Sequence, residues 1–284
     1  MLQRTFCHLP GVGIKTERRL WEQGIISWEL MVARATLPPR LNNARKLLED
    51  SISHLQKGNA EFFAATLGPQ ESWRMFHEYK DHVAYVDIET TGGTPGNDHI
   101  TAIALYDGRT VRTYVHGENL EQFEEDIADT KLLVTFNGKC FDVPVIEREL
   151  RMRMPGAHID LRHLLAGLGY RGGLKRCEKA FGLNRDELDG VDGYFAVLFW
   201  NEYQRTGDPK ILETLLAYNV EDVISLEILL HHAINLKLEQ TPFYSELACE
   251  VPRIAANPHR AHQEVVLQAR ENMFRYSVPR WFQG

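Results

Sequence analysis

The sequence predicts an α/β protein in which a mixed sheet is flanked by helices and a small helical region precedes the sheet. Three observations predict it: helical apolar spacing up to about residue 80, a group of short strand-like runs from His82 onward, and helical spacing again in the second half. Apolar residues make up 44% and charged residues 25% of the 284, which is typical of a globular protein. This length suits one sizeable domain with a smaller appendage.

The first 80 residues are predicted to form a helical N-terminal region. LNNARKLLEDSISHLQ and AEFFAATL carry apolar residues three and four positions apart, and we find no strand-like run there.

From His82 the pattern changes to strands. HVAYVDIE is typical of a buried strand, and HITAIALYD and RTVRTYVHG are predicted to be antiparallel neighbours joined at Asp107-Gly108. The acidic segment ENLEQFEEDIAD is predicted to be helical, and KLLVTFN is predicted to return as a strand to the same sheet. The result is a meander extended into a mixed sheet.

The second half is predicted to be mostly helical. The helices expected are VPVIEREL, LRHLLAGL, LKRCEKAFG, YFAVLFWNEYQRTG and PKILETLLAYNVEDVISLEILLHHAINL, with a brief strand at AHID. From Glu239 the chain becomes more polar, which indicates a peripheral arm with one helix. We therefore expect three parts: residues 1–80, 81–238 and 239–284.

Composition limits the classes of function. The four cysteines form no CxxC pair, which argues against a zinc knuckle or a disulfide framework and favours a reducing cytoplasm. No window approaches the roughly 18 apolar residues of a membrane span, and the start lacks a signal-peptide pattern. We expect a cytoplasmic protein without a membrane partner. The net charge of −7 argues against coating of nucleic acid by bulk electrostatics, but it allows an acidic metal site.

Two acids lie at the end of the first predicted strand. Asp87 and Glu89 are separated by one residue, so the period of a strand turns both side chains to one face. Adjacent buried carboxylates are costly unless a cation or a proton compensates them, which favours a divalent metal site. The alternative is an exposed strand end.

Three further polar residues follow at later junctions. Asp142 stands where a strand meets a helix that has Pro144 near its first turn, and its simpler interpretation is a helix N-cap. Tyr218 and Asp222 are four residues apart and share one face of the last long helix. The simpler interpretation is a core tyrosine and a surface acid.

Together these motifs, DxE, N-x3-FD and YN-x2-D, resemble the DEDD exonucleases over residues 82 to 232. The tyrosine four residues before the last acid is similar to the tyrosine subclass (DEDDy), and GGLKRCEKAFGL and YNVEDV resemble predicted bacterial ribonuclease H-like exonucleases. The resemblance implies a ribonuclease H-like fold and a 3′→5′ exonuclease acting on single-stranded nucleic acid ends.

The resemblance also implies roles for individual residues. Asp87, Glu89, Asp142 and Asp222 would hold two Mg²⁺ or Mn²⁺ ions, with Asp87 bridging both. Glu89 and Asp222 would complete the shell of one ion and Asp142 would support the other. Tyr218 would orient the attacking water or help to deprotonate it.

Residues around the second motif have weaker predictions. Asn137 is a candidate contact of the terminal nucleotide, whereas Phe141 is expected to be a core residue behind Asp142. Four cations near the motifs either contact phosphates or are simply solvated, and they are Lys139, Arg171, Lys175 and Arg176.

At the N-terminus, LPGVGIKTERRLWEQGI resembles a helix-hairpin-helix element. Gly11 and Gly13 would form its turn, and backbone N–H groups at the following helix would receive a phosphate. An ordinary turn with a helical cap is the equal alternative.

Two other classes of function stay open. One is a catalytically silent nucleic-acid-binding module, because fold alone does not establish chemistry. The other is a nuclease or phosphodiesterase with endonucleolytic or small-nucleotide specificity.

Overall fold

A computed structural model describes residues 1–34, 43–93, 96–185 and 193–277 of the chain. Its centre is a five-stranded sheet in the order β3-β2-β1-β4-β5. The strands are β1 (Val83–Thr90), β2 (Ile100–Tyr106), β3 (Val111–Val115), β4 (Leu132–Thr135) and β5 (His158–Asp160). The first three form an antiparallel meander, and β4 and β5 add in parallel to β1. The predicted mixed sheet is confirmed.

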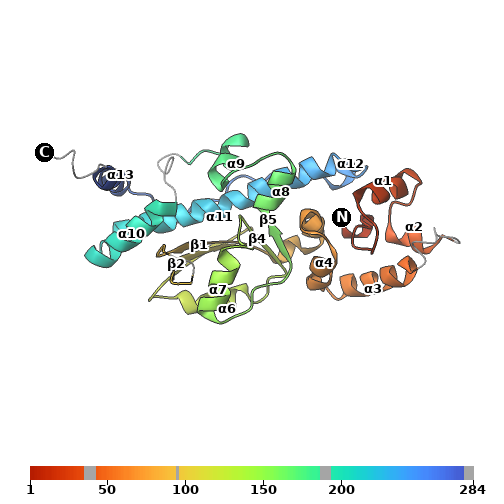
Figure 1. Ribbon diagram of the computed structural model, residues 1–284, viewed down its shortest axis with the longest axis horizontal. Coiled ribbons are helices and arrows are strands. Elements are labelled where there is room, and N and C mark those ends of the chain that lie inside the picture. Colours follow the sequence, from red (N-terminus) through yellow and green to blue (C-terminus); the bar gives the residue numbers. More distant parts are fainter. Residues whose placement is uncertain (35–42, 94–95, 186–192, 278–284) are drawn as a thin grey trace.

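Helices cover both faces of this sheet (Figure 1). On one face, Tyr85 of β1 belongs to the core shared with α11 (Pro209–Leu238). On the other face, Val86 packs in the core with α6 (Phe123–Ile127) and α7 (Asp142–Leu150). Because side chains alternate along a strand, every second residue of β1 faces α11. Asp87 and Glu89 are therefore on the α11 side.

The long helix α11 organises the second half of the chain. Its first turn is fixed by Asp208, whose carboxylate accepts a hydrogen bond from the N–H of Lys210, and by Pro209 at the first helical position. The helices α8 (Leu161–Gly167), α9 (Leu174–Ala180) and α10 (Gly193–Thr206) pack against α11. Within the described ranges, no helix combines the length and the hydropathy needed to cross a membrane.

The N-terminal region is helical, as predicted, and the described part of residues 1–82 contains no strand. Its elements are η1 (Leu2–Arg4), α1 (Ile14–Glu22), α2 (Trp28–Val32), α3 (Ala44–Gln56), α4 (Ala60–Thr66), η3 (Pro69–Met75), α5 (Phe76–Tyr79) and η4 (Lys80–His82). Its apolar residues join the core between the sheet and α11 in one continuous cluster. The division at residue 80 stays a prediction.

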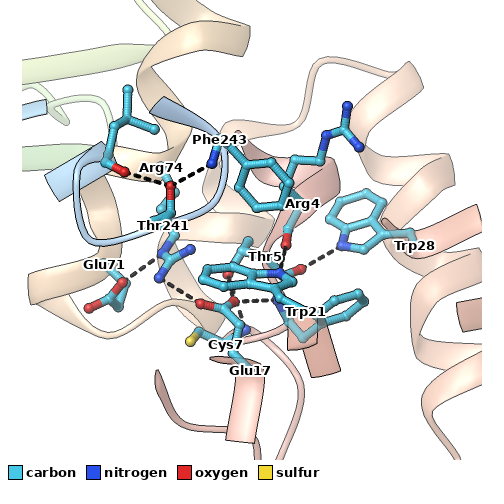
Figure 2. A network of polar contacts seen from close by, with 12 residues as sticks. Arg4, Thr5, Cys7, Glu17, Trp21, Trp28, Glu71, Arg74, Thr241 and Phe243 are labelled. Atoms are coloured by element: carbon cyan, nitrogen blue, oxygen red, sulfur yellow. Dashed lines mark hydrogen bonds and ion pairs between the residues drawn. The ribbon is translucent and has the colours of Figure 1, made fainter. Parts of the chain in front are cut away.

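A buried ion network holds the N-terminal turn against η3 (Figure 2). Glu17 of α1 is fully buried, and its carboxylate accepts hydrogen bonds from the Thr5 hydroxyl at 2.6 Å and the Phe6 N–H at 2.7 Å. Arg74 of η3 donates to Glu17 at 2.8 Å and to Glu71 at 2.6 Å. One guanidinium thus joins two carboxylates from segments distant in sequence.

The C-terminal arm differs from the single helix expected. Its described part forms two helices, α12 (Tyr244–Leu247) and α13 (Gln263–Ser277). Between them, the Asn257 amide donates to the carbonyl oxygen of Ala217 in α11 at 2.8 Å. Val266 of α13 is buried against α10 and α11. Because few apolar residues make this contact, the polar composition of the arm did not predict a second packed helix.

Candidate active site

The site begins where β1 extends beyond its neighbour β4. The two strands pair only from Val83 to Tyr85 of β1, whereas pairing with β2 continues to Thr90. The later residues of β1 therefore have an open backbone edge on the β4 side. An unpaired buried N–H group is costly, so this edge needs another acceptor.

Asp142 provides that acceptor. Its Oδ1 accepts a hydrogen bond from the Ile88 N–H at 3.2 Å, and the residue is almost completely buried. Asp142 is the first residue of α7, and Phe141 occupies the N-cap position without a side-chain capping bond. The N-cap interpretation of Asp142 is therefore wrong, because its carboxylate turns toward β1 instead.

Three of the predicted acids meet in one group. One carboxylate oxygen each from Asp87, Glu89 and Asp222 lies within 4.8 Å of the others. Two acids come from β1 and the third from α11, whose turn also carries Tyr218. Asp142 is not in this group of three, although it lies near enough to affect its electrostatics.

The group carries an excess of negative charge in a buried place. Burial raises the pKa of Asp87 well above its usual range, and Asp222 and Asp142 raise it further. The same causes raise the pKa of Glu89. Burial also raises the pKa of Asp142, to about 7. Converging oxygen donors that resist ionisation until a cation arrives fit a hard divalent ion, and ribonuclease H-like nucleases use such ions.

Asn219 is a site residue that sequence reasoning missed. Its amide donates to Asp87 Oδ2 at 2.7 Å, and the residue is fully buried. Its Oδ1 has no hydrogen-bond partner among the residues with described positions. Asn219 follows Tyr218 directly in the YN pair of the last motif. Its place in that motif is the sequence feature that could have predicted a role in the site.

Two cations reach the site from α9 and the segment after it. Lys175 Nζ donates to the Tyr218 hydroxyl at 2.9 Å and lies 4.5 Å from the centre of its ring. Arg185 forms an ion pair with Asp222 and donates to both oxygens of Glu178, at 2.7 and 2.5 Å. Burial and then Asp222 raise the pKa of Tyr218 far above its usual value. Tyr218 therefore keeps its proton.

The second motif is held in shape by Asp160. Its carboxylate accepts the N–H of Asn137 at 2.9 Å and, as the N-cap of α8, the N–H of Arg162 at 3.0 Å. Asn137 has a left-handed backbone (φ 70°), and its side-chain oxygen accepts from Arg162 at 2.6 Å. A Cβ at Gly138 would lie 2.3 Å from Thr135 Oγ1, so the turn requires glycine there.

The expectation for Phe141 turns out differently. Phe141 is 40% exposed, so it is not the core residue expected behind Asp142. Successive residues at the start of a helix point in different directions, and Asp142 takes the inward one. At the N-terminus, Gly11 has φ +77° and Gly13 caps α1, but only the three-residue helix η1 precedes them. Neither glycine belongs to the acidic group.

One relative is similar in sequence to just over half of the chain. The chain is 29% identical over 175 residues to the uncharacterized protein YprB of Bacillus subtilis (strain 168), and the match covers 54% of this chain and 42% of YprB. The matched region thus spans less than half the length of that relative.

Two solved structures are distantly similar. The family B DNA polymerase of Pyrobaculum calidifontis is 22% identical with a TM-score of 0.42, and the match covers 55% of this chain and 24% of the polymerase. The Nibbler EXO domain of Aedes aegypti is 15% identical with a TM-score of 0.40, and the match covers 60% of this chain and 85% of that domain. Scores this low carry no argument about activity.

A family model decides the assignment. It describes the RNase H superfamily and matches residues 84–234, which is more than half of the chain and includes the whole acidic group. The protein therefore belongs to the RNase H superfamily.

Proposed function

We propose that the protein is a metal-dependent 3′→5′ exonuclease that hydrolyses phosphodiester bonds at single-stranded nucleic acid ends. The observation that carries the proposal is the group of Asp87, Glu89 and Asp222, in which Asp87 is half-buried and the other two acids are buried. A fold does not need three like charges in one place for stability, because such charges repel and resist burial. A bound cation that offsets their repulsion would account for their convergence.

The donor set fits Mg²⁺ or Mn²⁺, which prefer oxygen ligands. Asp87, Glu89 and Asp222 would hold the metal, and Asp142 would hold or orient a second ion beside Ile88. Two ions in such a site supply an activated water and stabilise the leaving 3′ oxygen.

The remaining residues position these groups. Asn219 fixes one oxygen of Asp87 through its hydrogen bond, which leaves the other oxygen for a ligand. The raised pKa of Tyr218 favours a neutral phenol that orients the attacking water by hydrogen bonding rather than a phenolate that removes its proton. Of the two roles that the resemblance implies for Tyr218, we therefore favour orientation of the water.

Asn137, Gly11 and Gly13 are the proposed substrate contacts. Asn137 is held by Asp160 and Arg162 in a fixed orientation at the end of β4, where it would contact the terminal nucleotide. Gly11 and Gly13 would receive a more distant phosphate at the start of α1. A single-stranded end suits the site, because a paired strand would obstruct access to the backbone phosphate.

The test is digestion of 5′-labelled single-stranded DNA and RNA with Mg²⁺, with Mn²⁺ or with EDTA. Wild-type protein is compared with Asp222→Ala and with Asp129→Ala, in which an exposed acid outside the three motifs is removed. We expect a metal-dependent ladder that shortens from the 3′ end, absent with Asp222→Ala and retained with Asp129→Ala. Internal fragments from the start of the reaction would favour an endonuclease, and intact polymer would favour a binding module or a small-nucleotide substrate.

A further inference from the structure

Positive charge is concentrated beside the acidic group. Residues 161–185 contain six lysines and arginines and one acid, Glu178, in a chain with a net charge of −7. Glu178 is buried and paired with Arg185. The segment comprises α8, the loop after it, α9 and the five residues that follow α9.

Helix α9 presents this charge on one side. A helix turns by about 100° per residue, so Lys175, Arg176 and Lys179 fall within about a quarter of its circumference. The opposite side carries Cys177 and Glu178, which are both buried. Arg176 and Lys179 are exposed, so the charged side faces away from the core.

The loop before α9 extends this surface. Arg171 is exposed, and Gly172 has a left-handed backbone (φ +122°). A Cβ at Gly172 would lie 2.7 Å from Cδ of Arg176, so the arginine stem rests directly on the backbone of the loop. We call Arg171, Lys175, Arg176 and Lys179 the α9 basic face.

One member connects the face to the site. Lys175 donates to the Tyr218 hydroxyl, one helical turn from Asp222. The face therefore begins at the candidate active site and continues outward along α9. A seven-residue helix is about 10 Å long, which is enough for a few successive phosphates of an extended strand.

We propose that the α9 basic face binds the backbone phosphates of a single-stranded nucleic acid upstream of the end that lies at the acidic group. This inference rests on the proposed function, since it supplies the path by which the substrate approaches that site. A net acidic protein needs a local cationic surface of this kind to hold a polyanion. The contacts are electrostatic and independent of base sequence.

The test is the salt dependence of binding, measured by fluorescence anisotropy of a short labelled single-stranded oligonucleotide in EDTA, where metal-dependent cleavage cannot occur. The variant replaces Arg171, Arg176 and Lys179 by Gln. Its control replaces Lys57, Arg109 and Arg153 by Gln, which removes the same number of exposed arginines and lysines from other segments. Thermal unfolding of both triple variants verifies their folding.

For a single strand, each neutralised phosphate contributes about 0.7 to the slope of log K against log salt. We expect the α9 variant to lose about 2 from the wild-type slope and the control to keep it. Equal slopes for the two variants, or no binding by the wild type, would overturn the inference. If the wild type cleaves but the two variants have equal slopes, the α9 basic face is contradicted and the exonuclease proposal stands. If the α9 variant has a reduced slope but the wild type does not cleave, the exonuclease proposal is contradicted and the binding surface stands.

Discussion

The protein buries two groups of charged side chains, and they are built in opposite ways. In the N-terminal region, Arg74 lies between Glu17 and Glu71, and its partners outweigh the effect of burial so that its pKa rises. In the candidate active site, Asp87 and Glu89 face Asp222, and burial and mutual repulsion raise the pKa of both β1 acids.

The difference separates a structural use of buried charge from a functional one. The first network carries its own counterion and hydrogen-bonds the backbone of the N-terminal turn. The second has an arginine and a lysine at its edge, Arg185 and Lys175, but it keeps an excess of carboxylates. A group that contains its own counterion suits a structural role, whereas an unbalanced group is suited to binding an external cation.

The largest expected effect is on turnover at the unbalanced group. Asp87→Asn should lower the rate by about 10³-fold or more, because a metal ligand is lost. In EDTA at alkaline pH, the same change should raise the free energy of unfolding by about 1 kcal/mol, because one like charge is removed. Nuclease assays and urea denaturation measure the two quantities. A large loss of stability would contradict the interpretation of this group as repulsive.

The balanced network should respond in the opposite direction. Arg74→Met should lower the free energy of unfolding by about 3–5 kcal/mol, because Glu17 and Glu71 are left buried without a counterion. The exposed pair of Arg205 with Glu202 is the matched control, and Arg205→Met should change stability by at most about 1 kcal/mol. Urea denaturation compares the two variants. Similar losses of unfolding free energy would contradict the distinction between the buried network and the exposed pair.

The stability of the metal-free protein should depend on pH through the acidic group. The folded-state pKa of Asp142, about 7, lies above its usual value of 3.8, so the native state binds more protons than the unfolded chain between these values. The contribution of Asp142 to the free energy of unfolding should therefore be fully present below about pH 4 and be lost as pH rises toward 7. Metal should oppose the fall, by about 2.7 kcal/mol at a hundredfold excess over its Kd. Urea denaturation at several pH values, with and without Mn²⁺, measures the pH dependence and the effect of metal. If the metal-free wild type became more stable relative to Asp142→Asn between about pH 4 and 7, the raised pKa of Asp142 would be contradicted.

The smallest expected effect concerns the turn that the balanced network holds. Gly13 has φ −100° and open space around its Cβ position, so Gly13→Ala should change stability by at most about 1 kcal/mol. If a phosphate binds at the start of α1, the methyl group should weaken oligonucleotide binding about two- to fivefold. Anisotropy titrations measure this, and unchanged affinity would favour an ordinary helical cap.

Much of the fold could be predicted because local periodicity encodes it. The alternation in HVAYVDIE placed Asp87 and Glu89 on one face of β1, and the four-residue spacing placed Tyr218 and Asp222 on one face of α11. The strands of the meander and their turn at Asp107-Gly108 followed from composition in the same way.

What could not be predicted depends on how distant segments meet. The bond between Asn219 and Asp87 joins residues 132 positions apart, and the position of α11 on the sheet decides it. The ion pair of Arg185 with Asp222 and the exposure of Phe141 depend likewise on tertiary packing. Local spacing contains no information on such contacts.

The position of α11 also has a consequence for synthesis of the chain. Asp222 completes a group whose first acids, on β1, are translated more than 130 residues earlier. A ribosome-bound chain can therefore form the antiparallel meander, whose contacts are local, well before it possesses the third carboxylate. Until α11 emerges and docks, the nascent chain therefore lacks the complete acidic group and with it the proposed metal site.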